Sequence, residues 1–274
     1  MIKYSNKRME RIFWMAYTLQ EIVNKLTGID DIFFFKLAED KGFCEELLQV
    51  ILENKNIKIT QNKPQAVLRN IKGRSVTLDL ECIDENGVLF DVEVQKQDND
   101  DHQKRVRYNI ANMDTAESEK GIKFQELKDI YMVYISKFDM FNKGKTIYHI
   151  DRVIRETQET VYNGTHEIYV NTKIDDGSEI AEYMQILKQQ SLPDNPKFPN
   201  SCKAIRNIKT GKGDGKMCDL VQEYAKEYAD QEKIKMLVEM FNDGLVTIEA
   251  AVNKLGITEE KFMEYSEEYN RQMV

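Results

Sequence analysis

The chain has 274 residues, of which 39 are Lys or Arg, 47 are Asp or Glu, and 41% are hydrophobic. This hydrophobic share supports a real core and excludes a disordered chain, while 4 Pro and 13 Gly exclude a collagen-like one. No stretch approaches the roughly 20 apolar residues of a membrane span, and the first residues lack the apolar core of a signal peptide. We therefore expect a globular protein of the cytoplasm with no membrane partner.

The cysteines and histidines lie too far apart in the sequence to form a site from neighbouring residues. The four cysteines are Cys44, Cys82, Cys202 and Cys218, and the three histidines are His102, His149 and His166. Without closely spaced pairs, the cysteines are expected to be reduced, mostly packed thiols. The histidines indicate neither a zinc site nor a His-based nucleophile relay.

The elements follow a mixed order along the chain. Apolar residues from Cys44 to Leu52 recur at helical spacing, and from Val76 to Gln95 the period changes to two. Further expected elements are a helix at 101–119, strands at Tyr131–Ser136, Thr146–Ile150, Val153–Ile154 and Glu167–Val170, and a helix at Ser178–Gln190. This order predicts an α/β or α+β fold in which helices cover at least one face of a sheet.

A hairpin between Arg74 and Gln95 contains the chemically informative residues. The sequence Glu85-Asn86-Gly87 fits a three-residue loop whose last residue is left-handed, so Asp84 faces Val88. This register pairs Cys82 with Phe90, Leu80 with Val92 and Leu78 with Val94 on an apolar face. It pairs Thr77 with Gln95, Asp79 with Glu93 and Glu81 with Asp91 on the other face.

Four carboxylates on neighbouring rungs repel one another. Like charges opposite each other cost about 0.2–1 kcal/mol per exposed pair, which solvent or a divalent cation must offset. Oxygen-only ligands suit Mg²⁺ or Mn²⁺. From the pattern alone a solvated surface is the more frequent explanation, and a slip in register by one residue would separate Asp79 from Glu93.

An Asp, a turn and a following Glu-x-Gln resemble the signature of the PD-(D/E)XK nuclease superfamily. More closely, the order and spacing of four motifs resemble the bacterial PD-(D/E)XK nuclease family transposases, also called recombination-promoting nucleases. The motifs are Gly73-Arg-Ser-Val-Thr-Leu-Asp79, Asp91-Val-Glu93-Val-Gln95, Arg105-Val-Arg-Tyr108 and Gly121-Ile-Lys-Phe-Gln-Glu-Leu127. The resemblance runs roughly from Asp31 to Leu192 and implies an α/β, restriction-endonuclease-like core with a mixed sheet flanked by helices. It also favours the metal site over the solvated surface.

The resemblance implies specific roles for the hairpin residues. Asp79 and Glu93, with the backbone carbonyl of Val94, would hold Mg²⁺ or Mn²⁺. Gln95 stands at the superfamily's Lys position, where it orients a water without supplying positive charge. The missing cation would come from Lys104, from Arg105 or from a second metal ion.

Other residues have competing explanations. Asp31 matches the family's early Asp-x-x-Phe element and Glu46 lies on the first helix, so either is a candidate for a further metal ligand. The residue pattern favours a helix N-cap for Asp31 and a solvated position for Glu46. Lys104, Arg105 and Tyr108 are candidate substrate contacts, although packing or a surface ion pair explains Arg105 and Tyr108 equally well. Asn109 replaces the second of two tyrosines that the family often has.

Charge and composition divide the chain into four parts. These are an N-terminal helical extension (1–30), the nuclease-like domain (31–200), a basic Gly/Lys linker (201–216) and an acidic helical tail (217–274). The linker sequence Thr210-Gly-Lys-Gly-Asp-Gly-Lys216 lacks the spacing of a phosphate-binding loop, so no nucleotide cofactor is expected. The tail has 13 acidic and 6 basic residues. Its last segment resembles a helix-turn-helix but is too acidic to enter a DNA groove, which favours packing on the body or pairing between protomers.

Together these features predict a Mg²⁺-dependent DNA endonuclease of the recombination-promoting type. The alternative is a catalytically weak or inactive nuclease fold that binds nucleic acid or a protein partner, since Gln95 and Asn109 depart from the family pattern. An enzyme that also joins DNA strands is a third reading. Cleavage of both strands would favour a homodimer.

Overall fold

The computed structural model describes residues 23–69, 74–98, 101–118, 121–211, 230 and 233–272. Two compact units are distinguished. The larger spans Asn24–Met217, and the other combines Met1–Val23 with Cys218–Val274. Each unit is described separately below.

The larger unit is built on a mixed sheet, which among the described residues has six strands in the order β1-β2-β3-β4-β6-β5. The strands are β1 (Ile59–Leu68), β2 (Val76–Asp84), β3 (Leu89–Gln95), β4 (Ile130–Ser136), β5 (Ile147–Ile150) and β6 (Thr165–Asn171). The pairs β3–β4 and β4–β6 are parallel, whereas the other neighbours are antiparallel. The predicted α/β class with a mixed sheet is confirmed.

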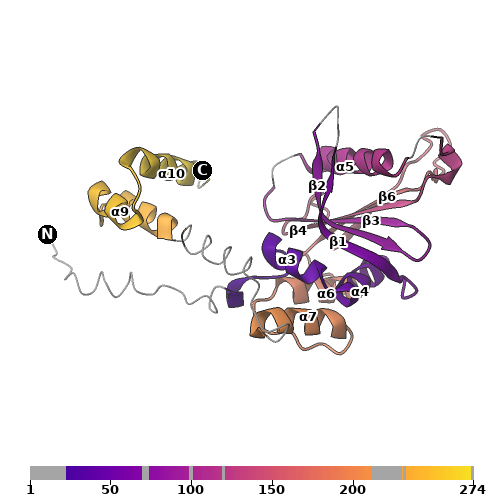
Figure 1. The fold of residues 1–274 in the computed structure, drawn as a ribbon, viewed down its shortest axis with the longest axis horizontal. Helices are drawn as coiled ribbons and strands as arrows, with labels where there is room; N and C mark the ends of the chain where they lie inside the picture. Colours follow the sequence, from indigo (N-terminus) through magenta and orange to yellow (C-terminus); the bar gives the residue numbers. More distant parts are fainter. Residues whose placement is uncertain are drawn as a thin grey trace. The chain divides into compact units, whose positions relative to one another are not determined.

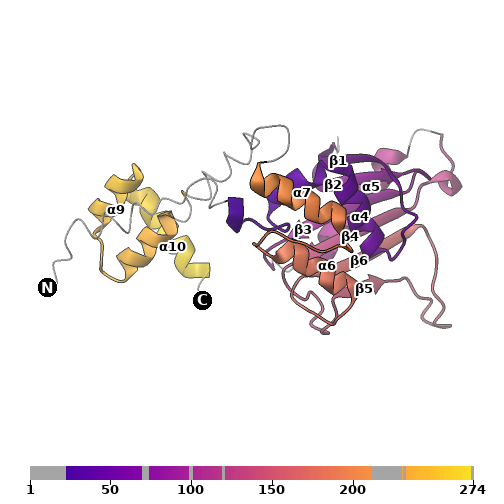
Figure 2. The ribbon, with the colours of Figure 1, turned by 90° about the horizontal axis from the view of Figure 1, so that it is seen from below.

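Helices cover both faces of this sheet (Figures 1 and 2). Helix α5 (His102–Glu117) lies on one face. The other face carries α3 (Asp31–Ala38), α4 (Lys41–Ile51), α6 (Glu179–Lys188) and α7 (Pro199–Thr210). A short 3-10 helix, η1 (Phe124–Glu126), precedes β4. Beneath α5, Val106, Ile110 and Met113 pack on Leu89 and Met132, which gives this face its own apolar core.

The predicted hairpin forms, but its ladder is shorter than expected. Three predicted pairs are present: Leu80 with Val92, Glu81 with Asp91, and Cys82 with Phe90. The Asp84 amide donates to the Val88 carbonyl at 3.1 Å, and Gly87 has a φ of +78°, a left-handed conformation that glycine adopts without strain. The turn is therefore the predicted one.

Beyond Leu80 the two strands part. The predicted pairs Asp79–Glu93, Leu78–Val94 and Thr77–Gln95 are absent from the ladder. Leu78 packs instead in the core beneath α5. The pairing of β2 with β1 continues through this region, because Ala66 pairs with Leu78 and Leu68 with Val76. Strand β2 therefore stays paired with β1 and separates from β3, which leaves a fork between β2 and β3.

Two segments differ from the sequence prediction. Ser201–Lys216 was predicted as an exposed linker, but residues 201–210 belong to α7, which packs against α4. Lys209 is only 3% exposed, and its ammonium donates to the carbonyls of Asn24 and Gln190. Residues 212–216 lie outside the described residues. The predicted strand at Val153–Ile154 is reduced to one bridge between Val153 and Thr160.

Three of the cysteines are buried free thiols, as predicted: Cys44, Cys82 and Cys202. Cys218 lies outside the described residues. Within the part of the chain that the structure describes, no helix combines the length and apolar character needed to cross a membrane.

The smaller unit is helical over its described part, with a helix at 233–242 followed by α9 (Ile248–Leu255) and α10 (Glu259–Gln272). Leu237, Val238, Ala251 and Phe262 are fully buried and form its core. Gly256 ends α9 in a left-handed conformation with a φ of +67°. Helical spacing in the tail thus reflects a local core.

Candidate active site

The fork between β2 and β3 is held by carboxylates. The Asp79 amide donates to the Glu93 Oε1 atom at 3.1 Å, and the Val94 amide donates to the Asp79 Oδ2 atom at 2.9 Å. Amides that lose their ladder partners inside a protein need other acceptors, and these two side chains supply them. Each carboxylate keeps a second oxygen. The same contacts fix the orientation of both side chains.

A cleft of about 810 Å³ opens at this fork, between β2, β3 and the first turns of α5. All but one of the predicted site residues line it: Asp31, Asp79, Glu93, Val94, Gln95, Lys104, Arg105 and Tyr108. The exception is Glu46. The structure therefore gathers residues from α3, β2, β3 and α5 around one cavity.

The electrostatics of the cleft favour a cation. Burial, reinforced by neighbouring carboxylates, raises the pKa of Asp79 to about 6 and that of Glu93 to about 8. Asp91 is fully buried behind them, and burial together with the charges of Glu93 and Asp79 raises its pKa well above the ordinary value. At neutral pH the site cannot hold all of these charges unless a positive group joins them.

The donor set fits Mg²⁺ better than a metal that needs an all-protein cage. Among the described residues no group of three or more His, Cys, Asp and Glu side chains is arranged to hold a metal ion. Magnesium binds through one or two carboxylates and keeps several waters, so Asp79 and Glu93 suffice for it.

The backbone carbonyl of Val94 is a third candidate ligand beside the carboxylates of Asp79 and Glu93. Leu89 and Gln95 bond to the β4 side through the Asp129 carbonyl and the Lys137 amide, whereas the Val94 amide points to β2. In a strand the amide and carbonyl of one residue point the same way, so the Val94 carbonyl also faces β2, where the ladder has ended.

Arg105 is the cation associated with both carboxylates. Its Nη1 atom lies 3.3 Å from the Gln95 Oε1 atom, and its Nη2 atom lies 3.4 Å from an Asp101 oxygen. Its charge lowers the pKa of Asp79 and of Glu93, opposing the effect of burial. The Gln95 amide nitrogen donates to the Gln97 carbonyl at 2.9 Å. Arg105 thus stands beside the position where the superfamily's Lys is missing.

The rest of α5 contributes contacts of two kinds. The Tyr108 hydroxyl donates to the Arg74 carbonyl at 2.6 Å, which ties α5 to the start of β2. Asn109 is buried, and its amide lies 3.4 Å from the Asp91 carboxylate. Lys104 and Arg107 are exposed at the cleft wall. Sequence reasoning overlooked Arg74 and Arg107 as site residues, although both stand inside the motifs that mark the family.

Asp31 lines the cleft, whereas Glu46 does not. Asp31 is the first residue of α3 and not its N-cap, which is Asp30. Its carboxylate is 70% exposed, lies 3.7 Å from the Lys96 ammonium and lines the cleft.

Glu46 is buried, and its carboxylate accepts hydrogen bonds from the backbone amides of Asn200 (3.1 Å) and Ser201 (2.7 Å) at the start of α7. It is neither a solvated residue nor a part of the cleft, so the prediction of Glu46 as a metal ligand is corrected.

Comparison with known protein families decides the assignment. Residues 33–236 match the PD-(D/E)XK nuclease family transposases. The chain belongs to this family. The matched range includes the hairpin and α5, so it contains every residue that lines the cleft except Asp31. Neither the curated proteins nor the solved structures contain a significant match.

Proposed function

We propose that the protein is a Mg²⁺-dependent endonuclease that hydrolyses phosphodiester bonds in DNA. One observation carries the proposal: Asp79 and Glu93 meet at a fork whose cleft is walled by Arg74, Lys104, Arg105 and Arg107. A site for a hard cation thus lies against a basic surface. Such a surface suits a phosphate backbone.

The chain's own residues have distinct tasks in this proposal. Asp79, Glu93 and the Val94 carbonyl hold the ion, which when bound activates water and stabilises charge on the scissile phosphate. Gln95 orients the attacking water, since its amide offers both a donor and an acceptor. Arg105 contacts the phosphate and supplies the charge that Gln95 lacks, while Lys104 positions the backbone nearby. Asp31 is the candidate for a further acidic ligand.

The test is metal-dependent nicking of supercoiled plasmid. Asp79→Asn and Glu93→Gln each remove a negative ligand but keep an oxygen that can accept the backbone hydrogen bond, so the fold is retained while cleavage is lost. Glu81→Gln, on the next rung of β2 and outside the cleft lining, is the matched control and retains activity. Full cleavage by either cleft variant would refute the assignment.

A non-catalytic module is the second candidate, favoured by Gln95 at the Lys position and by Asn109 bound to Asp91. Calorimetric titration with Mg²⁺ separates the two proposals. An isotherm that Asp79→Asn removes supports the enzyme. Lack of binding at millimolar Mg²⁺, with or without DNA, supports the module.

Three finer points belong to the proposal. Because one such cleft cuts one strand, cleavage of both strands requires two copies, and the molar mass on DNA measured by light scattering tests this homodimer. Joining of cut ends, the reaction that transposition adds, is tested by supplying a second DNA duplex. Action on DNA also accords with a location in the cytoplasm.

A further inference from the structure

The edge of the sheet that includes Gln95 carries a series of lysines. Strands β3, β4 and β6 are parallel, so their carboxyl ends lie along the same edge, and β3 ends at Gln95 in the cleft. Lys137 directly follows β4, and Lys173 comes shortly after β6. Lys145 comes shortly before β5, which is antiparallel to β6 and therefore begins at this edge. The lysines are thus ordered by strand, outward from the cleft.

Hydrogen bonds hold these strand ends side by side. The Lys137 amide donates to the Gln95 carbonyl at 3.0 Å. The side chain of Asn171 joins the next two lysines, since its oxygen accepts from the Lys173 amide at 3.2 Å and its nitrogen donates to the Lys145 carbonyl at 2.8 Å. Neighbouring strands lie about 4.8 Å apart, so the three steps from β3 to β5 extend about 14 Å from Gln95. This distance equals the rise of about four base pairs of DNA.

The loop that carries Lys143 and Lys145 is fixed by its own hydrogen bonds. The hydroxyl of Tyr148 accepts from the amides of both lysines, at 3.3 and 3.1 Å, and donates to the buried carboxylate of Asp139 at 2.6 Å. Asp139 also accepts from the Gly144 amide at 2.8 Å. A backbone that is already ordered loses little further entropy when a ligand binds to it.

The ammonium groups along this edge are not used by the fold. Four lysines are exposed and make no side-chain hydrogen bond or ion pair within the part of the chain that the structure describes: Lys137, Lys143, Lys145 and Lys173. A fifth, Lys188 at the end of α6, places its ammonium 3.3 Å from a backbone carbonyl just after β6. These five residues are named the lysine row.

Three carboxylates lie on the loops that carry the row, and hydrogen bonds engage all of them. Asp139 is buried, and Asp175 accepts from a turn amide at 3.2 Å. Asp176 accepts from the Ser178 hydroxyl at 2.6 Å and from the Thr146 amide at 3.2 Å, and these bonds lower the pKa of Asp176 to about 2. The five lysines outnumber these carboxylates, so the edge keeps positive charge.

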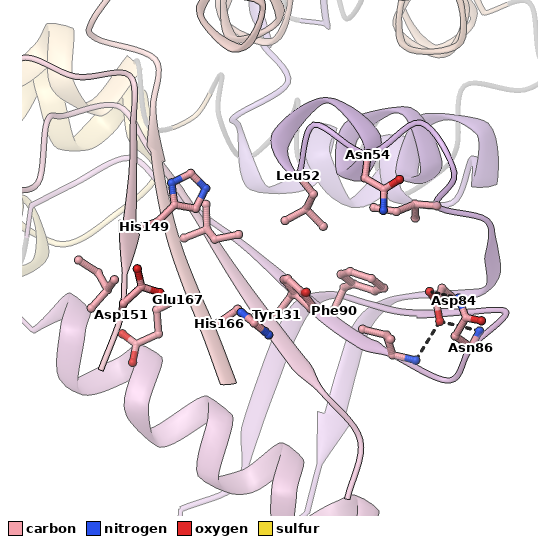
Figure 3. Close-up of a pocket in the computed structure, with 14 residues that line it drawn as sticks. Leu52, Asn54, Asp84, Asn86, Phe90, Tyr131, His149, Asp151, His166 and Glu167 are labelled. Carbon is pink, nitrogen blue, oxygen red and sulfur yellow. Dashed lines mark hydrogen bonds between the residues drawn. The ribbon is translucent and has the colours of Figure 1, made fainter. Parts of the chain in front are cut away.

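The opposite ends of the same strands differ in charge. A cavity of about 410 Å³ lies there, and Asp84 and Asp151 line it together with Phe90 near the start of β3 (Figure 3). None of its described lining residues is Lys or Arg. A phosphate backbone that enters the cleft at the fork is therefore attracted along the lysine row and not toward this cavity.

We propose that the lysine row binds the phosphate backbone of duplex DNA on one side of the bond that is cut. The identity of the partner rests on the proposed function, whereas the row rests on the contacts above. Exposed ammonium groups spread over about 14 Å suit successive phosphates of a backbone, which they contact without reading sequence. The row makes the protein favour duplexes that extend beyond the cleft by about four base pairs.

The test measures binding of the full chain to a fluorescent duplex of about 30 base pairs by anisotropy, over a series of salt concentrations. Ca²⁺, another hard cation, replaces Mg²⁺ to limit cleavage. The row variant combines Lys137→Gln with Lys173→Gln. The matched control combines Lys41→Gln with Lys203→Gln, which removes the same charge from exposed positions on α4 and α7.

Each phosphate contact contributes about 0.9 to the slope of log affinity against log salt concentration. The row variant is expected to reduce this slope by about 2 and to weaken binding about tenfold or more at about 50 mM salt, while the control matches the wild type.

The outcomes separate this inference from the proposed function. An unchanged slope in the row variant, or an equal loss in the control, would overturn the inference, while plasmid nicking that Asp79→Asn abolishes would leave the nuclease assignment intact. A loss of slope confined to the row variant supports the inference, and if the same chain nicks no plasmid, only the nuclease assignment is refuted. Absence of DNA binding by the wild type at low salt would also overturn the inference.

Discussion

Neutralising Glu93 should stabilise the metal-free protein at alkaline pH. Burial raises the pKa of Glu93 from 4.5 to about 8 and that of Asp79 from 3.8 to about 6. The folded protein therefore holds protons that the unfolded chain has released. This contribution to stability is fully present below the unfolded pKa values and is lost as the pH rises toward 8.

The size of the effect follows from the Glu93 pKa. At about 1.4 kcal/mol for each pKa unit, ionising Glu93 in the folded protein costs roughly 3–5 kcal/mol. Glu93→Gln avoids this cost, while its amide oxygen still accepts from the Asp79 amide. The variant should match the wild type within about 1 kcal/mol at pH 5, where Glu93 is protonated, and exceed its stability by about 3 kcal/mol at pH 8.5.

Urea denaturation in EDTA at the two pH values measures this difference, with Glu85→Gln in the exposed turn as the control. Added Mg²⁺ should raise the stability of the wild type at pH 8.5 and leave Glu93→Gln unchanged. The reasoning fails if Glu93→Gln is no more stable than the wild type at pH 8.5.

Three other substitutions test separate parts of the structure. Arg105→Gln should lower plasmid nicking about 100-fold and move the acid limb of the pH–rate profile to higher pH, because the charge of Arg105 no longer lowers the pKa of Asp79 and Glu93. Arg105→Lys should restore part of the rate. An unchanged pH–rate profile in Arg105→Gln would count against this role of Arg105. Glu46→Ala should cost about 2–3 kcal/mol in urea denaturation, because two buried amides of α7 lose their acceptor, yet leave Mg²⁺ affinity intact. Gly87→Ala should cost about 1 kcal/mol at its φ of +78°, and a neutral result would mean that the turn relaxes.

The hairpin shows what periodicity predicts well. Alternating apolar residues and a Gly-containing turn determine the register near the loop, and the pairs Leu80–Val92 and Glu81–Asp91 are as predicted. The fork beyond them could not be predicted, because β2 is diverted by its pairing with β1, and β1 was not recognised as a strand. That strand contains Pro64 and has polar residues at half of its ten positions, a pattern typical of a sheet edge.

The candidate site was predicted from motifs rather than from contacts. Asp79, Glu93 and Gln95 are close in sequence and share one hairpin, but their spacing alone favoured a solvated surface, and the resemblance to the family favoured a metal site. Glu46 was misplaced because its partners, the amides at the start of α7, are more than 150 residues away. The segment that forms α7 resembles a linker in sequence, because its lysines suggest exposure to solvent. In the structure Lys209 is buried, and its ammonium donates hydrogen bonds to two backbone carbonyls.

The crossed contacts at the fork have a consequence for reading relatives of this chain. Asp79 and Glu93 serve as acceptors for otherwise stranded amides, so the fold needs their oxygens even without chemistry. A copy that had lost cleavage would still be selected to retain Asp or Asn at the first position and Glu or Gln at the second. An acceptor oxygen at both positions is therefore a poor diagnostic of a working nuclease, and the acidic pair together with Arg105 is the better one.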